Sequence, residues 1–166
     1  GFGSPIVIIA GFLYGKWLGT IICIITFSIG SSCLYLFAQM YFKNLIFNFL
    51  ESKIKKFKDL FGKNEFLYFM LFRLAGGGGI PFPIQNILPV ALNMKVKNYF
   101  FATLLGLAPS TFIICSLGSG LENLIKENKN ITYLDIIYNQ EIYLPIIAFI
   151  LILALAYFVN KKIFKK

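Results

Sequence analysis

The sequence predicts an all-α polytopic membrane protein, and three observations lead to this fold class. Hydrophobic residues make up 58% of the 166-residue chain and charged residues only 14%, whereas soluble domains carry about 25% charged residues. Apolar runs of membrane length alternate with short lysine-rich segments. One stretch between such runs, residues 73–89, holds the only arginine, four successive glycines and three prolines. An ordinary lipid-facing helix does not tolerate that composition, so we expect this stretch to interrupt the spans.

The first apolar run, residues 5–42, contains Lys16 as its only charge. As a single helix it would be about 57 Å long at ~1.5 Å per residue, which exceeds the roughly 30 Å hydrocarbon core of a bilayer. We therefore expect the chain to turn back at residues 14–17, where a glycine permits the turn and Lys16 and Trp17 suit the membrane interface. This predicts a re-entrant half-helix over residues 5–14 and a transmembrane helix over 19–42.

Residues 43–65 are basic and amphipathic, with six lysines against three acidic residues and apolar side chains at three- and four-residue spacing. The pattern indicates a helix lying on the cytoplasmic membrane surface. Two roles are open for it, a binding surface for a partner protein or a plain connector, and the pattern favours the connector.

In the remainder of the chain, the sequence pattern predicts a re-entrant hairpin over residues 66–94 and a transmembrane helix over residues 99–117. Residues 122–141 carry four acidic residues and two lysines and form the predicted extracytoplasmic loop, and residues 142–166 form a last transmembrane helix with a basic tail. Since lysine-rich segments remain in the cytoplasm, residues 43–65 and 161–166 are expected there. The two re-entrant elements then enter the membrane from opposite sides.

A faint internal repeat agrees with this topology. When the sequence is shifted by 79 residues, a triplet in one half aligns with a similar triplet in the other half. Each triplet consists of a helix breaker followed by two hydroxyl residues. The two triplets, predicted as helix breaks at the repeat interface, are Gly30, Ser31 and Ser32, and Pro109, Ser110 and Thr111. The expected fold is therefore a pair of inverted repeats, each a re-entrant half-helix plus a transmembrane helix. The alternative role of the hydroxyl residues is ordinary helix–helix contact.

Arg73 is the permanent charge inside a predicted span, and two roles are open for it. Lying near the membrane surface, it can reach the cytoplasmic interface and serve structure alone. It can also hold an anion, because a guanidinium group matches the geometry of phosphate oxygens. An intramembrane charge is a functional hypothesis by default.

The residues after Arg73 offer further groups for an anion. Successive glycines can expose backbone N–H groups, and a proline in the first turn suits a half-helix whose positive end points into the membrane. The candidate substrate-binding residues are Arg73, Gly76, Gly77, Gly78, Gly79, Pro81, Pro83, Gln85 and Asn86. The two amides can equally satisfy backbone groups freed by the hairpin. The glycine run lacks the following Gly-Lys-Ser/Thr of a nucleotide-binding loop, so the sequence gives no support for ATP binding.

Several function classes lack the residues they need. The chain has no histidine and no Cys-X-X-Cys spacing, so no metal site, disulfide or cofactor is expected, and Cys23, Cys33 and Cys115 are expected to be small buried side chains. No carboxylate lies within a predicted span, so the residues that a proton relay or a hydrolase needs are missing there. No enzyme activity is expected. The net charge of +9 lies in clusters between apolar runs, which indicates membrane orientation and no nucleic-acid partner.

Two parts of the sequence carry a family resemblance. The residues of the first part are Gly3-Ser4-Pro5, residues 10–15 and Gly19, and those of the second are Phe72-Arg73, residues 80–83, Asn86, Pro89 and residues 103–111. In order and spacing they resemble the DedA/VTT superfamily, also called the SNARE-associated Golgi protein family, and in particular its Tvp-like branch. The resemblance covers about residues 3–121, and the expected membrane domain comprises residues 1–121. It implies two opposed re-entrant helices and movement of phospholipid or polyprenyl-phosphate between leaflets. By the same resemblance, Arg73 and the Pro81/Pro83 hairpin are substrate-site candidates.

The chain departs from the family pattern in two ways. Proton-linked bacterial members carry acidic residues in the first re-entrant region, and residues 1–50 contain none, which puts proton coupling in doubt. Family members usually have residues before the first re-entrant helix. Because this chain begins with Gly1 rather than Met, we expect an N-terminal segment to be missing. No cleavable signal peptide is recognisable.

Three functions follow as hypotheses. The first is a scramblase-like lipid transporter of a bacterial inner membrane, with anionic phosphate headgroups as its binding partners. The second is a secondary transporter of small ions or osmolytes, which shares the inverted-repeat arrangement. The third is a non-transporting assembly or scaffold protein that uses residues 43–63 as its partner surface.

Overall fold

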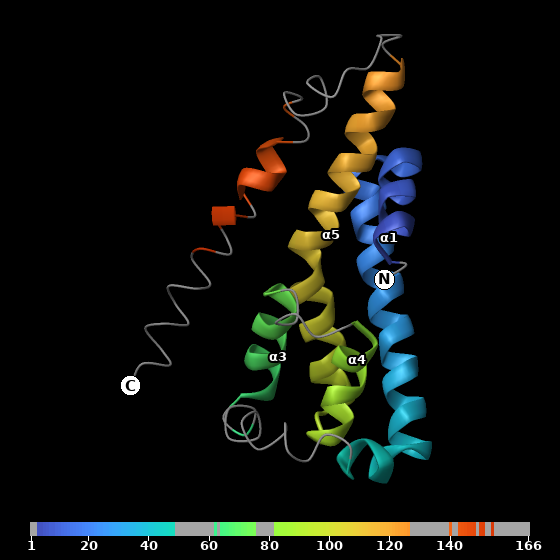
Figure 1. The fold of residues 1–166 in the computed structure, drawn as a ribbon, viewed down its shortest axis with the longest axis vertical. Helices are drawn as coiled ribbons and strands as arrows, with labels where there is room; N and C mark the ends of the chain where they lie inside the picture. The colour runs from blue at the N-terminus through green and yellow to red at the C-terminus, as the bar shows by residue number, and fades with distance from the viewer. Residues whose placement is uncertain are drawn as a thin grey trace. The chain divides into compact units, whose positions relative to one another are not determined.

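The structure is a computed structural model that describes residues 3–48, 62, 64–75, 82–126, 140, 143–148, 150, 151 and 154. Every regular element within these residues is a helix (Figure 1). The labelled helices are α1 (Gly3–Tyr41), α3 (Glu65–Leu74), α4 (Phe82–Ala91) and α5 (Val96–Lys126). The all-helical fold class is thus confirmed for the part of the chain that the structure describes.

Helices α1 and α5 are long and apolar enough to cross a membrane. Large hydrophobic side chains are exposed along α1, among them Ile9, Leu18, Ile25 and Met40. A soluble protein rarely exposes apolar surface of this extent, whereas a lipid-facing helix requires it.

A sharp break divides α1 at Gly15, within the expected turn. The backbone there has φ 74° and ψ 174°, a conformation open to glycine and strained for other residues. After the break the chain folds back on itself, as the dark blue segment of Figure 1 shows. Gly19 lies against the backbone of Ala10, so a Cβ at Gly19 would be 2.8 Å from the Ala10 carbonyl oxygen. The first arm is about 18 Å long and the second about 39 Å, at 1.5 Å per residue. The second arm alone is long enough to cross a bilayer.

Replacing Gly15 by alanine is expected to destabilise the protein by about 1–3 kcal/mol, the cost of a non-glycine residue in such a conformation. No atom of the described residues lies within 4 Å of the added Cβ, so the expected loss comes from backbone strain. The measurement is thermal unfolding in detergent, followed by fluorescence of the single tryptophan, Trp17, two residues from the break. Gly30→Ala is the matched control: this helical glycine also has open space around it, and alanine is the better helix former by about 1 kcal/mol. Equal unfolding temperatures for the two variants would contradict the assignment of strain to Gly15.

The chain forms two compact units that share both long helices. The first unit comprises Gly1–Ile24 and Ala108–Lys166, and the second comprises Ile25–Leu107. The first unit therefore contains the short arm before Gly15, and the second contains the two short helices α3 and α4. Both long helices contribute to both units.

In the first unit, the arm before Gly15 crosses α5 with backbones in close contact. A Cβ on Gly11 would overlap the backbone of Cys115, and a Cβ on Gly118 would overlap the backbone of Ile8. The Cys115 thiol also donates a hydrogen bond to the Val7 carbonyl oxygen at 3.5 Å. Glycines at a crossing allow helices to approach this closely, which is a common device for helix association in membranes.

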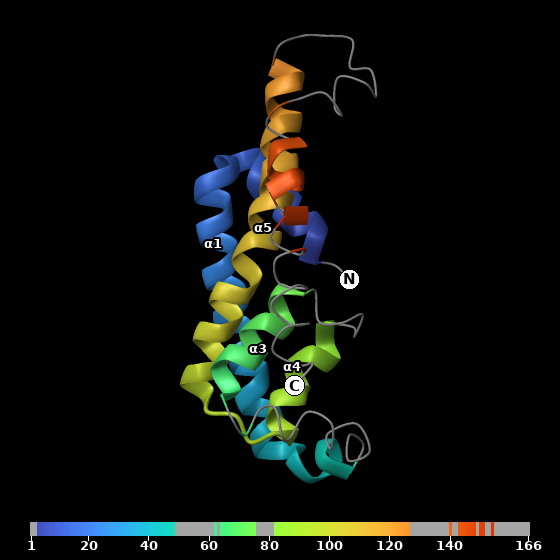
Figure 2. The same cartoon turned by 90° about the vertical axis from the view of Figure 1, so that its left-hand side faces the viewer.

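In the second unit, α3 and α4 form an antiparallel pair beside α5 (Figure 2). Asn64 caps α3 by accepting a hydrogen bond from the Leu67 backbone N–H at 3.0 Å. Glu65 at the start of α3 lies near Lys95 and Asn98 just after α4, while Arg73 at the end of α3 contacts α4 near its start. Each helix has 10 residues, or about 15 Å, so neither crosses a bilayer alone.

The structure differs from the expected elements in several places. Helix α5 continues to Lys126, two turns past the predicted span end. Gly118 and Gly120 do not end it, and Lys126 pairs with Glu122 one turn earlier at 2.6 Å, which supports the last turn. The first residues of the predicted loop 122–141 are therefore helical. Cys33 is exposed rather than buried, since it lies on the outward face of α1, whereas Cys23 and Cys115 are buried.

Other expectations fall partly outside the described residues. Of the predicted surface helix 43–65, residues 43–48 are helical, and most of the rest is not described. Residues 143–148 are helical in the predicted last span, and the tail 161–166 is not described.

Candidate functional site

The second unit buries a guanidinium group among neutral polar side chains. Arg73 is 2% exposed, near the end of α3. Its Nη1 donates a hydrogen bond to Gln85 Oε1 at 3.4 Å, and its Nη2 donates to Asn86 Oδ1 and to the Tyr99 hydroxyl oxygen, the latter at 3.2 Å. The Tyr99 hydroxyl in turn donates to Asn86 Oδ1 at 3.1 Å. These four residues, from α3, α4 and α5, are called the Arg73 cluster below.

Aromatic rings enclose the cluster. The Arg73 Cζ atom lies 5.0 Å from the centroid of the Phe69 ring and 5.9 Å from that of Tyr99. The Tyr99 ring stacks on Tyr35 of α1, with 5.0 Å between centroids, and Tyr35 donates a hydrogen bond to the Met94 carbonyl oxygen at 2.6 Å. Cation–π contacts of a desolvated guanidinium contribute about 2 kcal/mol or more. The rings therefore fix the guanidinium and exclude water from it.

Local sequence explains why these side chains meet. Phe69 and Arg73 are four residues apart and so share one face of α3. Gly106 allows that face to approach α5 closely, because a Cβ at this position would lie 2.9 Å from the Met70 carbonyl oxygen and closer still to the Arg73 Cβ. Tyr99 and Gly106 are seven residues apart on α5 and so occupy the same face.

A second polar contact fixes the other end of α3. Glu65 accepts hydrogen bonds from the backbone N–H of Lys95, at 3.3 and 3.4 Å, and from Asn98 Nδ2 at 2.6 Å. Both donors lie at the start of α5, where free N–H groups and the helix dipole favour a carboxylate. Glu65 thus joins the N-termini of α3 and α5 and sets the position of the helix that carries Arg73.

The chemistry of the cluster suits an anion. Arg73 donates to Gln85, Asn86 and Tyr99, which carry no charge. Neutral oxygens satisfy guanidinium N–H groups without cancelling the cation. A phosphate oxygen accepts stronger, charge-assisted hydrogen bonds from the same fork, and can thus displace neutral acceptors.

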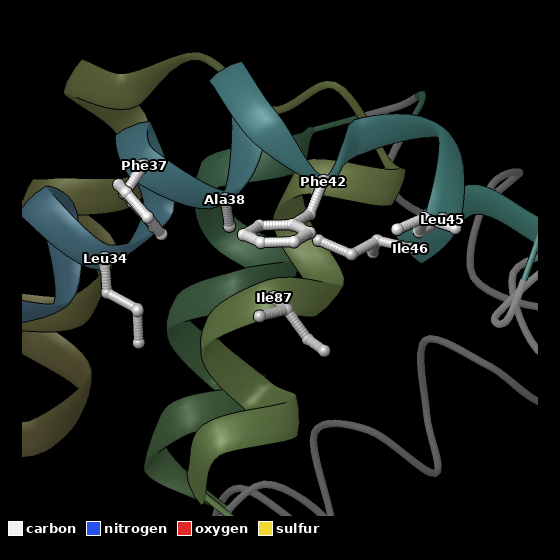
Figure 3. A pocket seen from close by; sticks show the side chains of 7 residues that line it. All are labelled: Leu34, Phe37, Ala38, Phe42, Leu45, Ile46 and Ile87. Atoms are coloured by element: carbon white, nitrogen blue, oxygen red, sulfur yellow. The ribbon is translucent and has the colours of Figure 1, made fainter.

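An apolar groove of about 540 Å³ lies in the same unit (Figure 3). Side chains of α1, of Phe42 and of the helical residues 43–48 form most of it, including Phe37 and Ile46, and Ile87 of α4 closes one side. Ile87 directly follows Asn86 of the Arg73 cluster. One short helix therefore contributes to a buried polar cluster and to an open apolar groove.

The structure brings together three of the predicted binding residues, Arg73, Gln85 and Asn86. Pro83 lies in the first turn of α4 and is exposed. Gly76, Gly77, Gly78, Gly79 and Pro81 lie outside the described residues.

The predicted repeat-interface triplets divide between the two units. Gly30 is exposed, with nothing within 4 Å of a Cβ built on it, and α1 continues through it without a break. A single glycine does not break an apolar helix that keeps its hydrogen bonds. Ser31 is buried and donates to the Ser28 carbonyl oxygen at 3.2 Å, and Ser32 is half-buried. Pro109 lies inside α5, with Ser110 half-buried and Thr111 buried.

Sequence reasoning missed Tyr99, Phe69, Gly106 and Glu65. The spacing of the first three could have indicated them, because residues four or seven positions apart share one helix face. Phe69 is four residues from Arg73, and Tyr99 is seven residues from Gly106. Glu65 was assigned to the end of the preceding surface helix, although Asn64 before it is a typical helix cap.

Comparison with known proteins assigns most of this architecture to one family. Residues 2–120 match the family described as the VTT domain. Transmembrane protein 41 homolog from Caenorhabditis elegans is 25% identical over 119 residues, which cover 70% of this chain and 48% of that protein. The chain thus matches about half the length of this relative. No solved structure matches the chain.

Proposed function

The chain belongs to the VTT-domain family of membrane proteins, and from this premise we propose that it moves phospholipid or polyprenyl-phosphate headgroups between the two leaflets. One observation carries the proposal: a buried guanidinium that donates hydrogen bonds to neutral side chains lies in the same compact unit as an open apolar groove. A lipid has both parts, an anionic phosphate and apolar chains. In this proposal Arg73 binds the phosphate and the groove accommodates an acyl or prenyl chain.

The groove favours a lipid over the other two hypotheses. A transporter of small ions or osmolytes has no use for an apolar groove of about 540 Å³ beside its polar site. The scaffold hypothesis depends on residues 43–63, most of which lie outside the described residues. The glycine run 76–79 likewise has no part in the proposal.

The proposed topology consists of two inverted repeats with re-entrant elements. Support comes from length: the arm before Gly15 and helices α3 and α4 each reach about 15–18 Å, half of a bilayer core. Further support comes from the two units: one combines the arm before Gly15 with part of α5, and the other combines the α3–α4 pair with part of α5. We also propose the cytoplasmic placement of residues 43–65 and 161–166, a bacterial inner membrane as the location, and membership of the Tvp-like branch. The expected non-enzymatic, cofactor-free action belongs to the same proposal.

Lipid movement in reconstituted liposomes tests the function. Vesicles carry a phospholipid labelled with a fluorophore at its headgroup, and a membrane-impermeant reductant bleaches the outer leaflet. Added protein is expected to make the inner-leaflet label accessible. Arg73→Lys keeps the charge but loses the planar fork, and Arg73→Gln loses the charge. We expect Arg73→Gln to slow bleaching of the inner label at least tenfold, and Arg73→Lys to have an intermediate effect.

Lys97→Ala is the control, because it removes an exposed cation from the same unit. It is expected to keep the wild-type rate. If the wild-type protein does not raise the bleached fraction above that of empty vesicles, the proposed function is wrong. If Arg73→Gln folds and moves lipid at the wild-type rate, the assigned role of Arg73 is wrong.

A further inference from the structure

Buried hydroxyl groups continue the Arg73 cluster along the facing surfaces of α1 and α5. Ser28 and Ser31 are buried on α1, and Thr103 is buried on α5. Ser28, Ser31 and Tyr35 are three and four residues apart, so they share one face of α1. Tyr99, Thr103 and Gly106 share one face of α5 by the same spacing.

Tyr99 joins these two faces to Arg73. Its ring stacks on Tyr35, its hydroxyl group contacts Arg73 and Asn86, and the side chains of Ser31 and Thr103 lie beside that hydroxyl. The hydroxyl row, defined as Ser28, Ser31, Tyr99 and Thr103, therefore begins at the guanidinium and follows α1 and α5 away from it. All four residues belong to the second unit.

Two members of the row have hydroxyl groups without a hydrogen bond of normal geometry. Ser28 Oγ and Thr103 Oγ1 are both fully buried, and among the described residues neither makes a hydrogen bond of normal geometry, although the Thr103 hydroxyl lies beside that of Tyr99. A serine or threonine in a helix ordinarily satisfies its hydroxyl with a carbonyl one turn earlier, as Ser116 does with Phe112 at 2.8 Å. A buried hydroxyl left without a partner lowers stability, and alanine or valine would fill the same space without that penalty.

Unsatisfied polar groups beside a binding cluster indicate groups that bond to something else during function. The same segment of α1 presents apolar Leu34 and Ala38 to the open groove. A ligand that uses both surfaces must be amphiphilic. This condition excludes a bare ion and fits a phospholipid with a polar headgroup and apolar chains.

We propose that the hydroxyl row is the path of the lipid headgroup beyond Arg73, with Ser28 and Thr103 as hydrogen-bond donors to its phosphate and ester oxygens. The proposal rests on the proposed function, and it adds the route of the lipid headgroup, which runs between α1 and α5. The ligand class is a glycerophospholipid headgroup. The hydroxyl groups replace part of its hydration while it is away from water.

The test uses Thr103→Val and Ser28→Ala in the full chain, because each removes a hydroxyl and little volume. Both variants are expected to unfold at a temperature about 2–4 °C higher than the wild type, as relief of an unsatisfied buried hydroxyl predicts. In the liposome assay with headgroup-labelled phospholipid, each is expected to slow lipid movement at least threefold, and the double variant at least tenfold. Higher stability together with lower flux is a combination that a merely structural hydroxyl does not produce.

Ser116→Ala is the matched control. It removes a buried hydroxyl from α5 that already has a backbone partner, in the first unit. It is expected to keep the wild-type flux and to gain no stability.

Each outcome decides the proposal. Wild-type flux in Thr103→Val and Ser28→Ala would overturn the path while leaving the role of Arg73 intact. Lower flux with lower stability would also overturn it, since the hydroxyls would then be structural. Absence of lipid movement with the wild-type protein would instead refute the proposed function itself.

Discussion

Replacement of Asn86 by leucine is expected to destabilise the protein by about 3 kcal/mol, because it removes an acceptor from a buried guanidinium. Asn86 Oδ1 accepts hydrogen bonds from Arg73 Nη2 and from the Tyr99 hydroxyl, and the Asn86 side chain is 3% exposed. Leucine has similar volume and no polar atom. The loss is measured as the fraction of folded protein that survives heating in detergent, by fluorescence-detected size-exclusion chromatography.

A double-mutant cycle makes this prediction sharper. Removal of both partners, in Arg73→Met with Asn86→Leu, is expected to recover part of the stability lost in Asn86→Leu alone, because no buried cation remains. Asn44→Leu serves as control, since the Asn44 side chain is exposed, and a change within about 0.5 kcal/mol is expected. Strict additivity of the two single losses would show that Arg73 and Asn86 do not interact.

Gly11→Ala and Gly118→Ala are each expected to cost about 3 kcal/mol, the upper end of the range for overpacking. The atoms that the new Cβ would meet belong to the backbone of Cys115 and of Ile8. A backbone cannot rotate away as a flexible side chain can, so the two helices must separate. Trp17 reports the change, because its ring lies 5.0 Å from that of Phe112 in the same unit.

The two glycine variants share one crossing, so their effects should not add. Once the first alanine has separated the helices, the second meets less resistance, and the double variant should lose less than the sum of the single losses. Gly30→Ala is again the control, with open space around the added Cβ. Wild-type unfolding temperatures in both single variants would refute the close crossing.

The elements that the sequence predicted best are those dictated by length and by helix-breaking residues. An apolar run too long for one crossing had to turn, and Gly15 was a suitable position between Tyr14 and Lys16 within it. Glycines and prolines between residues 75 and 84 likewise separated α3 from α4. These constraints are local, so they can be read without knowledge of tertiary contacts.

Tertiary contacts account for what sequence reasoning missed. Tyr99 lies in an apolar span with many aromatic residues, and nothing local distinguishes it from an exposed tyrosine such as Tyr14. The end of α5 was placed too early for a similar reason, because charged residues there indicated a loop while the Glu122–Lys126 pair supports helix. The glycine crossings are equally invisible, since Gly11 and exposed Gly30 are the same residue type in similar runs.

The composition of the two units has a consequence for biosynthesis. The second unit is one continuous segment, Ile25–Leu107, and its contacts can form as soon as that segment has left the ribosome. The first unit is discontinuous: the bond between Val7 and Cys115 joins residues 108 positions apart. At synthesis rates of about 5–20 residues per second, roughly 5–20 s pass between synthesis of the N-terminal arm and synthesis of the α5 residues that it contacts. During that interval the arm can contact only the rest of α1, through Gly19, and its α5 face has no partner. The last-made unit is thus the one that contains the first residues of the chain.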